Sequence, residues 1–259
     1  MCLIIFSYRI KPQLPLVLAA NRDEFFSRPA KSGAFWKFPK RSSSILAGKD
    51  LKAGGTWIGI TRTGKFAAIT NIRGPSQTES KLKSRGHITV DFLLSLKTPI
   101  EFANQLKANF SQYAGFNLLI GDTKNLVYIN SHEELVSELK PGIYGLSNGV
   151  INSNWPKINN GRDKLKNLLM HDKDITTDNL IAMMYDRDIA TDEFLPSTGI
   201  SIEMERKLSP SFITIPEQGY GTLCTTGIIL SDSGLIKFNE QSYNEEGIPT
   251  KRHYYEFYR

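Results

Sequence analysis

Two apolar runs near the start of the chain give the first structural prediction. Residues 2–6 read CLIIF and residues 14–20 read LPLVLAA, with the polar segment 7–13 between them. Runs of this length, rich in branched side chains and bounded by Pro or polar residues, are typical of buried strands. Their order predicts a hairpin, which brings the end of the second strand beside the start of the first. The charged segment 21–24, NRDE, is then expected next to Cys2.

The remaining pattern alternates groups of strands with groups of helices. Short apolar runs between Gly and polar turns predict strands over 45–72, an antiparallel meander over 116–148, and further strands at 211–215 and 221–243. Apolar positions at helical spacing predict helices at 81–96, 99–110 and within 155–195, with a looser segment around 188–210. Residues 25–44 break the strand pattern with Pro, Gly and Ser, which predicts a long loop. Because no repeat or linker divides the chain, we expect one domain over residues 1–259.

Composition narrows the class of protein. The chain is 40% hydrophobic and 22% charged, with a net charge of +6, which fits an ordinary globular protein. So modest a charge argues against nucleic acid as a partner. No apolar run reaches the roughly twenty residues that span a bilayer, and CLIIF lacks the flanks of a signal peptide. We therefore expect a cytoplasmic protein without an integral membrane segment.

The metal-binding and redox residues are few. Cys2 and Cys224 are too few for a disulfide framework or a thiolate metal site, and Cys224 is expected to be inert inside an apolar strand. The four histidines show no paired spacing, so a zinc hydrolase is not expected. We predict no metal site and no bound cofactor, and leave the oligomeric state open.

Cys2 is the strongest candidate for chemistry. If Met1 is removed, Cys2 carries both a thiol and a free α-amine, whose pKa of about 7.7 to 8.0 suits a general base. Arg22 nearby would favour the reactive thiolate, and Asp23 would orient the ammonium form. The alternative is that Cys2 is a small buried strand residue without chemistry.

Two segments are candidates for binding an anionic ligand. Residues 25–44 interleave Phe35, Trp36 and Phe38 with five cations and contain no acid, which suits a flat ligand with anionic groups. An ordinary loop fixed by its aromatic residues fits equally well. Ser84 and Arg85 precede a predicted helix, whose N-terminus would bind phosphate or carboxylate; a capped helix with solvated Lys is the alternative.

Several motifs in fixed order resemble the NRDE family, also called the transport and Golgi organisation 2 group. They are MCLI at the start, NRDE at 21–24, GGTWIGIT at 54–61, TNIR at 70–73, KSRG at 83–86, GLSN at 145–148 and GTLCTTGIIL at 221–230. This family is similar to N-terminal nucleophile hydrolases of the choloylglycine hydrolase and penicillin acyltransferase branch. The resemblance implies an α+β fold, a four-layer αββα sandwich.

The resemblance also implies two kinds of function. One is a cysteine hydrolase or acyltransferase acting on an amide or thioester of a small or lipid-like substrate. The other is a carrier without turnover, for haem or an acyl-CoA-like anionic lipid, in haem trafficking or lipid homeostasis. Replacing Cys2 by Ala separates them, because a carrier survives the change.

The resemblance implies roles for particular residues as well. Cys2 would be the nucleophile, Arg22 and Asp23 its tuning partners, and Asn71 and Asn148 donors to the oxyanion or the pocket. The substrate would be bound by Asn21, Trp36, Trp57, Arg73, Ser84 and Arg85. The sequence departs from the pattern at two places. Arg and Asp are adjacent here but three residues apart in the hydrolases, and Leu223 stands where many family members have Arg. Which members of NRDE face the site is therefore left open.

Overall fold

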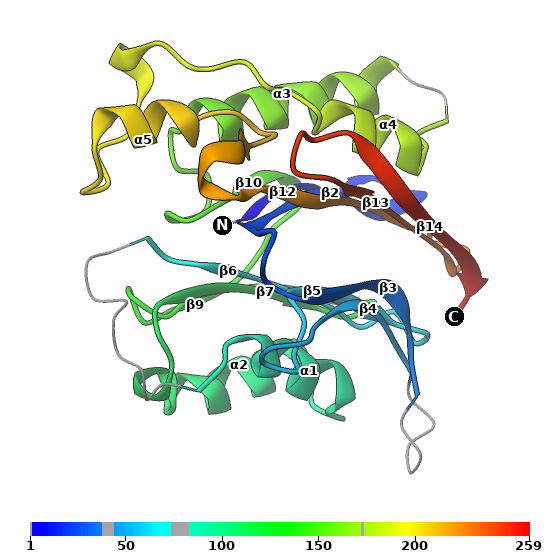
Figure 1. Ribbon diagram of the computed structural model, residues 1–259. Helices are drawn as coiled ribbons and strands as arrows, with labels where there is room; N and C mark the ends of the chain where they lie inside the picture. Colours follow the sequence, from blue (N-terminus) through cyan, green and yellow to red (C-terminus); the bar gives the residue numbers. More distant parts are fainter. Residues whose placement is uncertain (1, 38–43, 74–82, 172–173) are drawn as a thin grey trace. The chain divides into compact units, whose positions relative to one another are not determined.

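The computed structural model describes residues 2–37, 44–73, 83–171 and 174–259 (Figure 1). The chain divides into two compact units. The first unit joins Met1–Ser27 to Pro141–Phe257, and the second comprises Arg28–Lys140 with Tyr258–Arg259. The prediction of one domain over 1–259 stays a prediction.

The first unit is built on a sheet in which strands from both ends of the chain alternate. In the described part of the chain its strand order is β10-β1-β2-β12-β13-β14, and β11 pairs with β12. The strands are β1 (Cys2–Lys11), β2 (Leu14–Phe25), β10 (Gly142–Leu146), β11 (Thr214–Ile215), β12 (Tyr220–Leu230), β13 (Leu235–Tyr243) and β14 (Pro249–Tyr258).

The predicted hairpin is present, and both of its strands are longer than their apolar runs. β1 and β2 pair antiparallel with Ile4 opposite Ala20 and Cys2 opposite Arg22. Since side chains alternate along a strand, Leu3 and Ile5 share one face of the sheet with Val17 and Ala19. These four side chains form a core with the helices α3 (Pro156–His171) and α4 (Thr177–Met183). Figure 1 shows the two helices lying along this face. We call it the helix face of the sheet.

The second unit contains a meander that follows chain order from β3 to β9 in the described residues. The strands are β3 (Ala30–Trp36), β4 (Ile45–Asp50), β5 (Ile58–Thr61), β6 (Phe66–Asn71), β7 (Phe116–Gly121), β8 (Leu126–Asn130) and β9 (Leu135–Glu138). Two helices, α1 (Gly86–Leu94) and α2 (Pro99–Lys107), pack on it (Figure 1). Thr98 begins α2 with a reciprocal bond to Glu101, and Pro99 stands at its first position, which together fix the start of this helix.

The glycine pair in GGTW allows two backbones to approach closely. Gly54 adopts a φ of +81°, a left-handed conformation that favours glycine. A Cβ on Gly55 would lie 2.4 Å from the carbonyl carbon of Gly86, at the start of α1. Thr56 then donates its backbone N–H to Gly86 O at 3.2 Å. The motif therefore seats α1 on the sheet of the second unit.

The expectation of a loop over 25–44 was wrong for part of that segment. Residues Ala30–Trp36 form β3, which pairs with β4 and has a register shift between Lys31 and Ala34. Because β3 is an edge strand, one side of it needs no ladder partner, so Ser, Gly and Lys are tolerated there. Residues 38–43 lie outside the described residues, as do 81–82 of the helix predicted over 81–96.

The strand group predicted over 116–148 divides between the two sheets. β7, β8 and β9 form the expected antiparallel meander. β10 instead pairs with β1 in the other sheet, with Ile4 opposite Leu146. The chain changes unit at Lys140–Pro141, where Pro removes a backbone donor and interrupts a ladder. The meander prediction was therefore wrong for its last strand.

The final third of the chain holds smaller differences. α5 (Ile202–Lys207) and the short 3-10 helix η2 (Asp192–Phe194) lie within the segment expected to be looser, and β14 was not predicted. The strand expected at 211–215 shortens to β11. The other 3-10 turns are η1 (Phe110–Gln112) and η3 (Pro216–Gln218). Among the described residues, no helix has the length and apolar character to cross a membrane.

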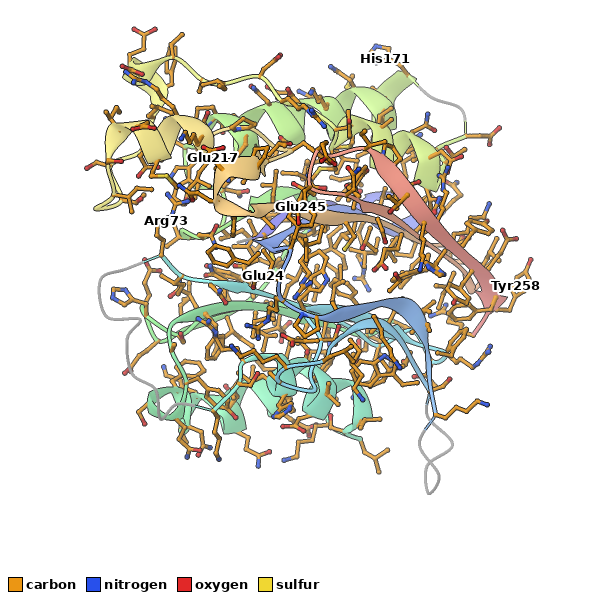
Figure 2. The ribbon with its side chains drawn as sticks, viewed as in Figure 1. Glu24, Arg73, His171, Glu217, Glu245 and Tyr258 are labelled. Carbon is orange, nitrogen blue, oxygen red and sulfur yellow. The ribbon has the colours of Figure 1, made fainter. Side chains whose placement is uncertain are left out.

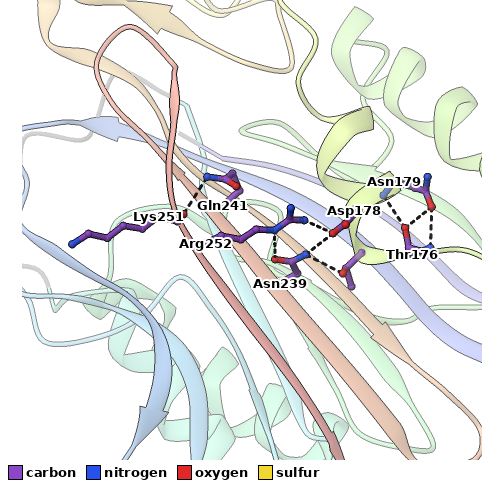
Figure 3. A network of polar contacts seen from close by, with 8 residues as sticks. Thr176, Asp178, Asn179, Asn239, Gln241, Lys251 and Arg252 are labelled. Atoms are coloured by element: carbon purple, nitrogen blue, oxygen red, sulfur yellow. Dashed lines mark hydrogen bonds and ion pairs between the residues drawn. The ribbon is translucent and has the colours of Figure 1, made fainter.

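A polar network ties the edge strand β14 to its neighbours (Figure 3). Buried Asn239 on β13 donates to Thr177 at 3.1 Å and to Asp178 at 2.8 Å, both in α4. Arg252 on β14 donates to Asn239 at 3.1 Å and pairs with Asp178. The network fixes where β14 lies against β13 and α4.

Candidate active site

Cys2 and Arg22 lie directly opposite one another on neighbouring strands. Directly opposed residues in an antiparallel pair project to the same face, with Cβ atoms about 4.5 to 5.5 Å apart. Their face is the one opposite the helix face, because Leu3 and Asn21, the next opposed pair, take the helix face. On the other side of Arg22, Cys224 of β12 occupies the same cross-strand row. One cation therefore lies between two thiols.

Burial dominates the chemistry of the Cys2 thiol. Cys2 is 9% exposed, and this burial raises the pKa of its thiol to about 11, with Asp23 and Glu24 adding to the rise. The charge of Arg22 lowers the pKa, in the expected direction, but by less. Arg22 therefore shifts the thiol pKa in the direction that the sequence predicted. The net pKa is nevertheless raised, because removing the thiolate from water costs more than Arg22 returns.

The burial of Cys224 fits the expectation that it is inert, which stays a prediction. Burial raises the pKa of its thiol well above the ordinary value, and the Glu240 carboxylate raises it further. Both cysteines are free thiols. Because two strand spacings separate them by about 10 Å, and a disulfide requires Cα atoms within about 7 Å, they do not pair in this fold.

Asp23 lies on the helix face, next in the strand after Arg22. Its Oδ1 accepts a hydrogen bond of 2.7 Å from Thr222, and its backbone carbonyl accepts one from the Tyr220 hydroxyl. Burial raises the pKa of the Asp23 carboxyl, while the positive charge of Lys157 and the Thr222 hydrogen bond lower it. Asp23 therefore acts on Cys2 by charge, from the opposite face of the sheet to Arg22.

Asn21 is a structural centre of the first unit. Its amide nitrogen donates to Met184 O at 3.1 Å and to Ser211 O at 2.7 Å, and its amide oxygen accepts from the Thr225 hydroxyl at 2.7 Å. The side chain is fully buried. These bonds join β2 to the end of α4, to the segment before β11, and to β12. Glu24 lies near the end of β2 (Figure 2), and its carboxylate accepts a hydrogen bond from the Phe25 backbone N–H.

Asn148 reaches the neighbourhood of Cys2 through Ser147. The Ser147 hydroxyl donates to the Cys2 carbonyl oxygen at 2.9 Å and lies 3.3 Å from the Asn148 side-chain oxygen. Ser147 and Asn148 are both buried. The sequence predicted a site role for Asn148 but none for Ser147, although both residues belong to the GLSN segment.

The other predicted site residues belong to the second unit. Asn71 ends β6 opposite Phe116, and Arg73 follows it (Figure 2). The Arg85 guanidinium donates to Gly115 O at 3.0 Å, and Ser84 accepts the His87 backbone N–H through its own backbone carbonyl.

Trp36 and Trp57 both pack against the core between the second unit's sheet and helices. The Trp36 ring nitrogen also donates to Ala47 O at 2.9 Å. The binding roles of these second-unit residues stay predictions. Across the described residues, no group of three His, Cys, Asp or Glu is arranged to hold a metal ion.

Comparison with known sequences identifies relatives along nearly the whole chain. A family model described as Transport and Golgi organisation 2 matches residues 1–245. The chain is 31% identical over 266 residues to a Transport and Golgi organization protein 2 homolog of Homo sapiens, covering 96% of this chain and 95% of the relative. It is 23% identical over 268 residues to Transport and Golgi organization protein 2 of Drosophila melanogaster, covering 93% and 92%.

Among solved structures, the chain is similar to the C2A mutant of conjugated bile acid hydrolase from Clostridium perfringens. The TM-score is 0.51 at 10% sequence identity, covering 99% of this chain and 97% of the hydrolase. At this identity the likeness shows the fold alone. It confirms the predicted fold class, α+β and similar to N-terminal nucleophile hydrolases.

Proposed function

Because the chain belongs to the Transport and Golgi organisation 2 family, with a hydrolase-like fold, we propose that it is a cysteine hydrolase or acyltransferase acting on an amide or thioester. The observation that carries this proposal is the position of Cys2. It opens β1 opposite Arg22, and its carbonyl is held by Ser147 next to Asn148. The candidate nucleophile, a cation and the candidate amide donor therefore lie near one another at one end of one sheet.

The proposed reaction has two steps. The Cys2 sulfur attacks the acyl carbon, the bond from that carbon to the leaving nitrogen or sulfur breaks, and the thiol proton ends on the leaving group. Water, or an acceptor alcohol or amine, then attacks the acyl-cysteine, releases the acyl product and returns the thiol. Asn148 would donate to the carbonyl oxygen as it gains charge, an interaction worth about 3 to 4 kcal/mol when correctly placed. We propose the same role for Asn71.

A thiol with a pKa of about 11 needs a base to take its proton. We propose that removal of Met1 provides it, because the α-amine of Cys2 then lies on the same residue as the sulfur. Buried Asp23, with Lys157 nearby, would hold the ammonium form after proton transfer. Retention of Met1 would leave the thiol without this base.

We propose that the substrate is small or lipid-like and anionic. In the part of the chain that the structure describes, the half-buried Arg22 guanidinium makes no hydrogen bond or ion pair. A half-buried guanidinium beside the candidate nucleophile suits a carboxylate or phosphate. We place the reaction in the cytoplasm, where Cys2 and Cys224 would stay reduced.

The test uses natively processed protein and two probes, hexanoyl-N-acetylcysteamine thioester and hexanoyl p-nitroanilide. Intact mass shows whether Met1 is removed and whether one hexanoyl group is added. We expect Met1 loss, acylation at Cys2, and turnover that Cys2→Ala abolishes and Cys224→Ala retains. Absence of both acylation and turnover in the wild type would refute the proposal.

The raised pKa of Cys2 supports a second candidate, a carrier without turnover, because the thiol is neutral at physiological pH. Its proposed cargo is haem or an acyl-CoA-like anionic lipid. Titration of haem and of hexanoyl-CoA into wild type and Cys2→Ala tests it. Equal, saturable binding by both proteins supports the carrier, and binding that depends on Cys2 contradicts it.

A further inference from the structure

The Ser147 side chain hydrogen-bonds to Cys2 just beyond the end of the backbone ladder between β1 and β10. The β1–β10 register runs from Tyr8 opposite Gly142 to Ile4 opposite Leu146, and β10 ends there. One more pair would place Leu3 opposite Ser147. Instead, the Ser147 hydroxyl supplies a hydrogen bond of 2.9 Å to the Cys2 carbonyl oxygen. The candidate nucleophile therefore stays tethered to its neighbouring strand by a side chain.

The chain after Ser147 is held in place on its far side. Asn152, with a left-handed φ of 58°, donates its backbone N–H to Gly145 O at 2.7 Å and accepts from Gly145 N at 2.9 Å. A Cβ on Gly149 would lie 2.7 Å from the Ser153 hydroxyl, so the turn packs closely. Ser147 and Asn148 are thus fixed between β10 and this turn.

The Ser147 hydroxyl contacts both the Cys2 backbone and the Asn148 side chain. Its oxygen lies 2.9 Å from the Cys2 carbonyl oxygen and 3.3 Å from the Asn148 side-chain oxygen. Because the oxygen of the Asn148 amide is the atom on Ser147, this contact uses neither hydrogen of the amide nitrogen.

We propose that Ser147 is a positioning residue of this reaction, which fixes the Cys2 carbonyl and directs the amide nitrogen of Asn148 toward the acyl group on Cys2. The proposal rests on the proposed function. The Ser147 hydroxyl connects the two residues, because it contacts the Cys2 carbonyl oxygen and the Asn148 side-chain oxygen. Holding the amide by its oxygen leaves the two hydrogens of its nitrogen for the acyl group.

The test compares acylation of Cys2 by hexanoyl-N-acetylcysteamine across a small set of variants. Ser147→Ala should lower the acylation rate constant ~10- to 100-fold, since a displacement of about 1 Å costs on that order, with little change in the concentration for half-maximal rate. Ser147→Thr keeps the hydroxyl and should restore most of the rate. Ser95→Ala is the matched control, because that hydroxyl also donates to a backbone carbonyl, Phe92 O at 2.8 Å, in the second unit, and it should acylate at the wild-type rate.

A double-mutant cycle separates positioning from general support of the fold. Because Ser147 also holds the Cys2 carbonyl, Ser147→Ala made in an Asn148→Ala protein should still lower the rate, but by a clearly smaller factor than in the wild type. Full additivity of the two losses, or a wild-type rate in Ser147→Ala, overturns the positioning role while the proposed function stands. A wild type that forms no acyl-Cys2 removes the proposed function, and the positioning role with it. Thermal unfolding of each variant identifies losses of folded protein, and in that case the Thr variant carries the test.

Discussion

Cys2 lies directly opposite Arg22 in the register of β1 and β2, yet burial holds its thiol neutral. With a pKa of about 11, the reactive thiolate is scarce at neutral pH and increases about tenfold per pH unit below that value. In a Cys224→Ala background, we expect the iodoacetamide rate at Cys2 to rise about tenfold per unit from pH 8 to pH 10. Arg22→Met should lower the rate at each pH, because Arg22 favours the thiolate. A fast rate at pH 7 that changes little with pH would contradict this.

Asn21 is expected to matter for stability rather than for substrate contact. Asn21→Ala removes three buried hydrogen bonds and leaves the carbonyls of Met184 and Ser211 without this donor. We expect a loss of about 2 to 4 kcal/mol in the free energy of unfolding, measured in urea. Asn154→Ala, on an exposed turn, is the control and should change it by less than about 0.5 kcal/mol. An equal effect of the two substitutions would show that the Asn21 bonds are not stabilising.

Gly55 should tolerate no side chain. A methyl group there meets the backbone of Gly86 at 2.4 Å, and neither backbone can rotate away. Gly55→Ala should cost about 3 kcal/mol or more, at the upper end of overpacking effects. The control is Gly115→Ala, whose Cβ lies at an ordinary 3.4 Å from Ile72. Thermal unfolding of both variants measures the difference, and a mild Gly55→Ala would mean that α1 shifts freely on the sheet.

In the network of Figure 3, Asn239 is expected to contribute more to stability than the ion pair between Arg252 and Asp178. Arg252 and Asp178 are 44% and 67% exposed, so breaking their ion pair with Arg252→Met should cost less than about 1 kcal/mol. Asn239 is buried and bonds to both α4 and β14, so Asn239→Ala should cost about 1 to 3 kcal/mol. Urea unfolding at low and high salt distinguishes them, because only the Arg252 effect should weaken as salt screens it. The reverse order of costs would contradict the assignment.

The alternation of side chains along β1 and β2 shows which part of the candidate site could be predicted from the sequence. The hairpin prediction placed NRDE beside Cys2, and the register confirms it. The same period of two, continued through Phe25, puts Asn21 and Asp23 on the helix face and Arg22 on the other. Which residues shared a face with Cys2 was therefore contained in the pattern, but only once β2 was known to extend through the charged segment.

Local pattern determined most elements of this protein, with β3 and β14 as exceptions, and contacts between distant residues determined the chemistry of its candidate site. Apolar runs and turn residues specify strands and the hairpin because they act on neighbours in the chain. The pKa of Cys2 depends on burial by the folded chain, β10 joins β1 across more than a hundred positions, and Ser147 reaches the Cys2 carbonyl across 145 positions. No periodicity in the sequence encodes those pairings, since only packing decides which groups lose water and which side chains meet.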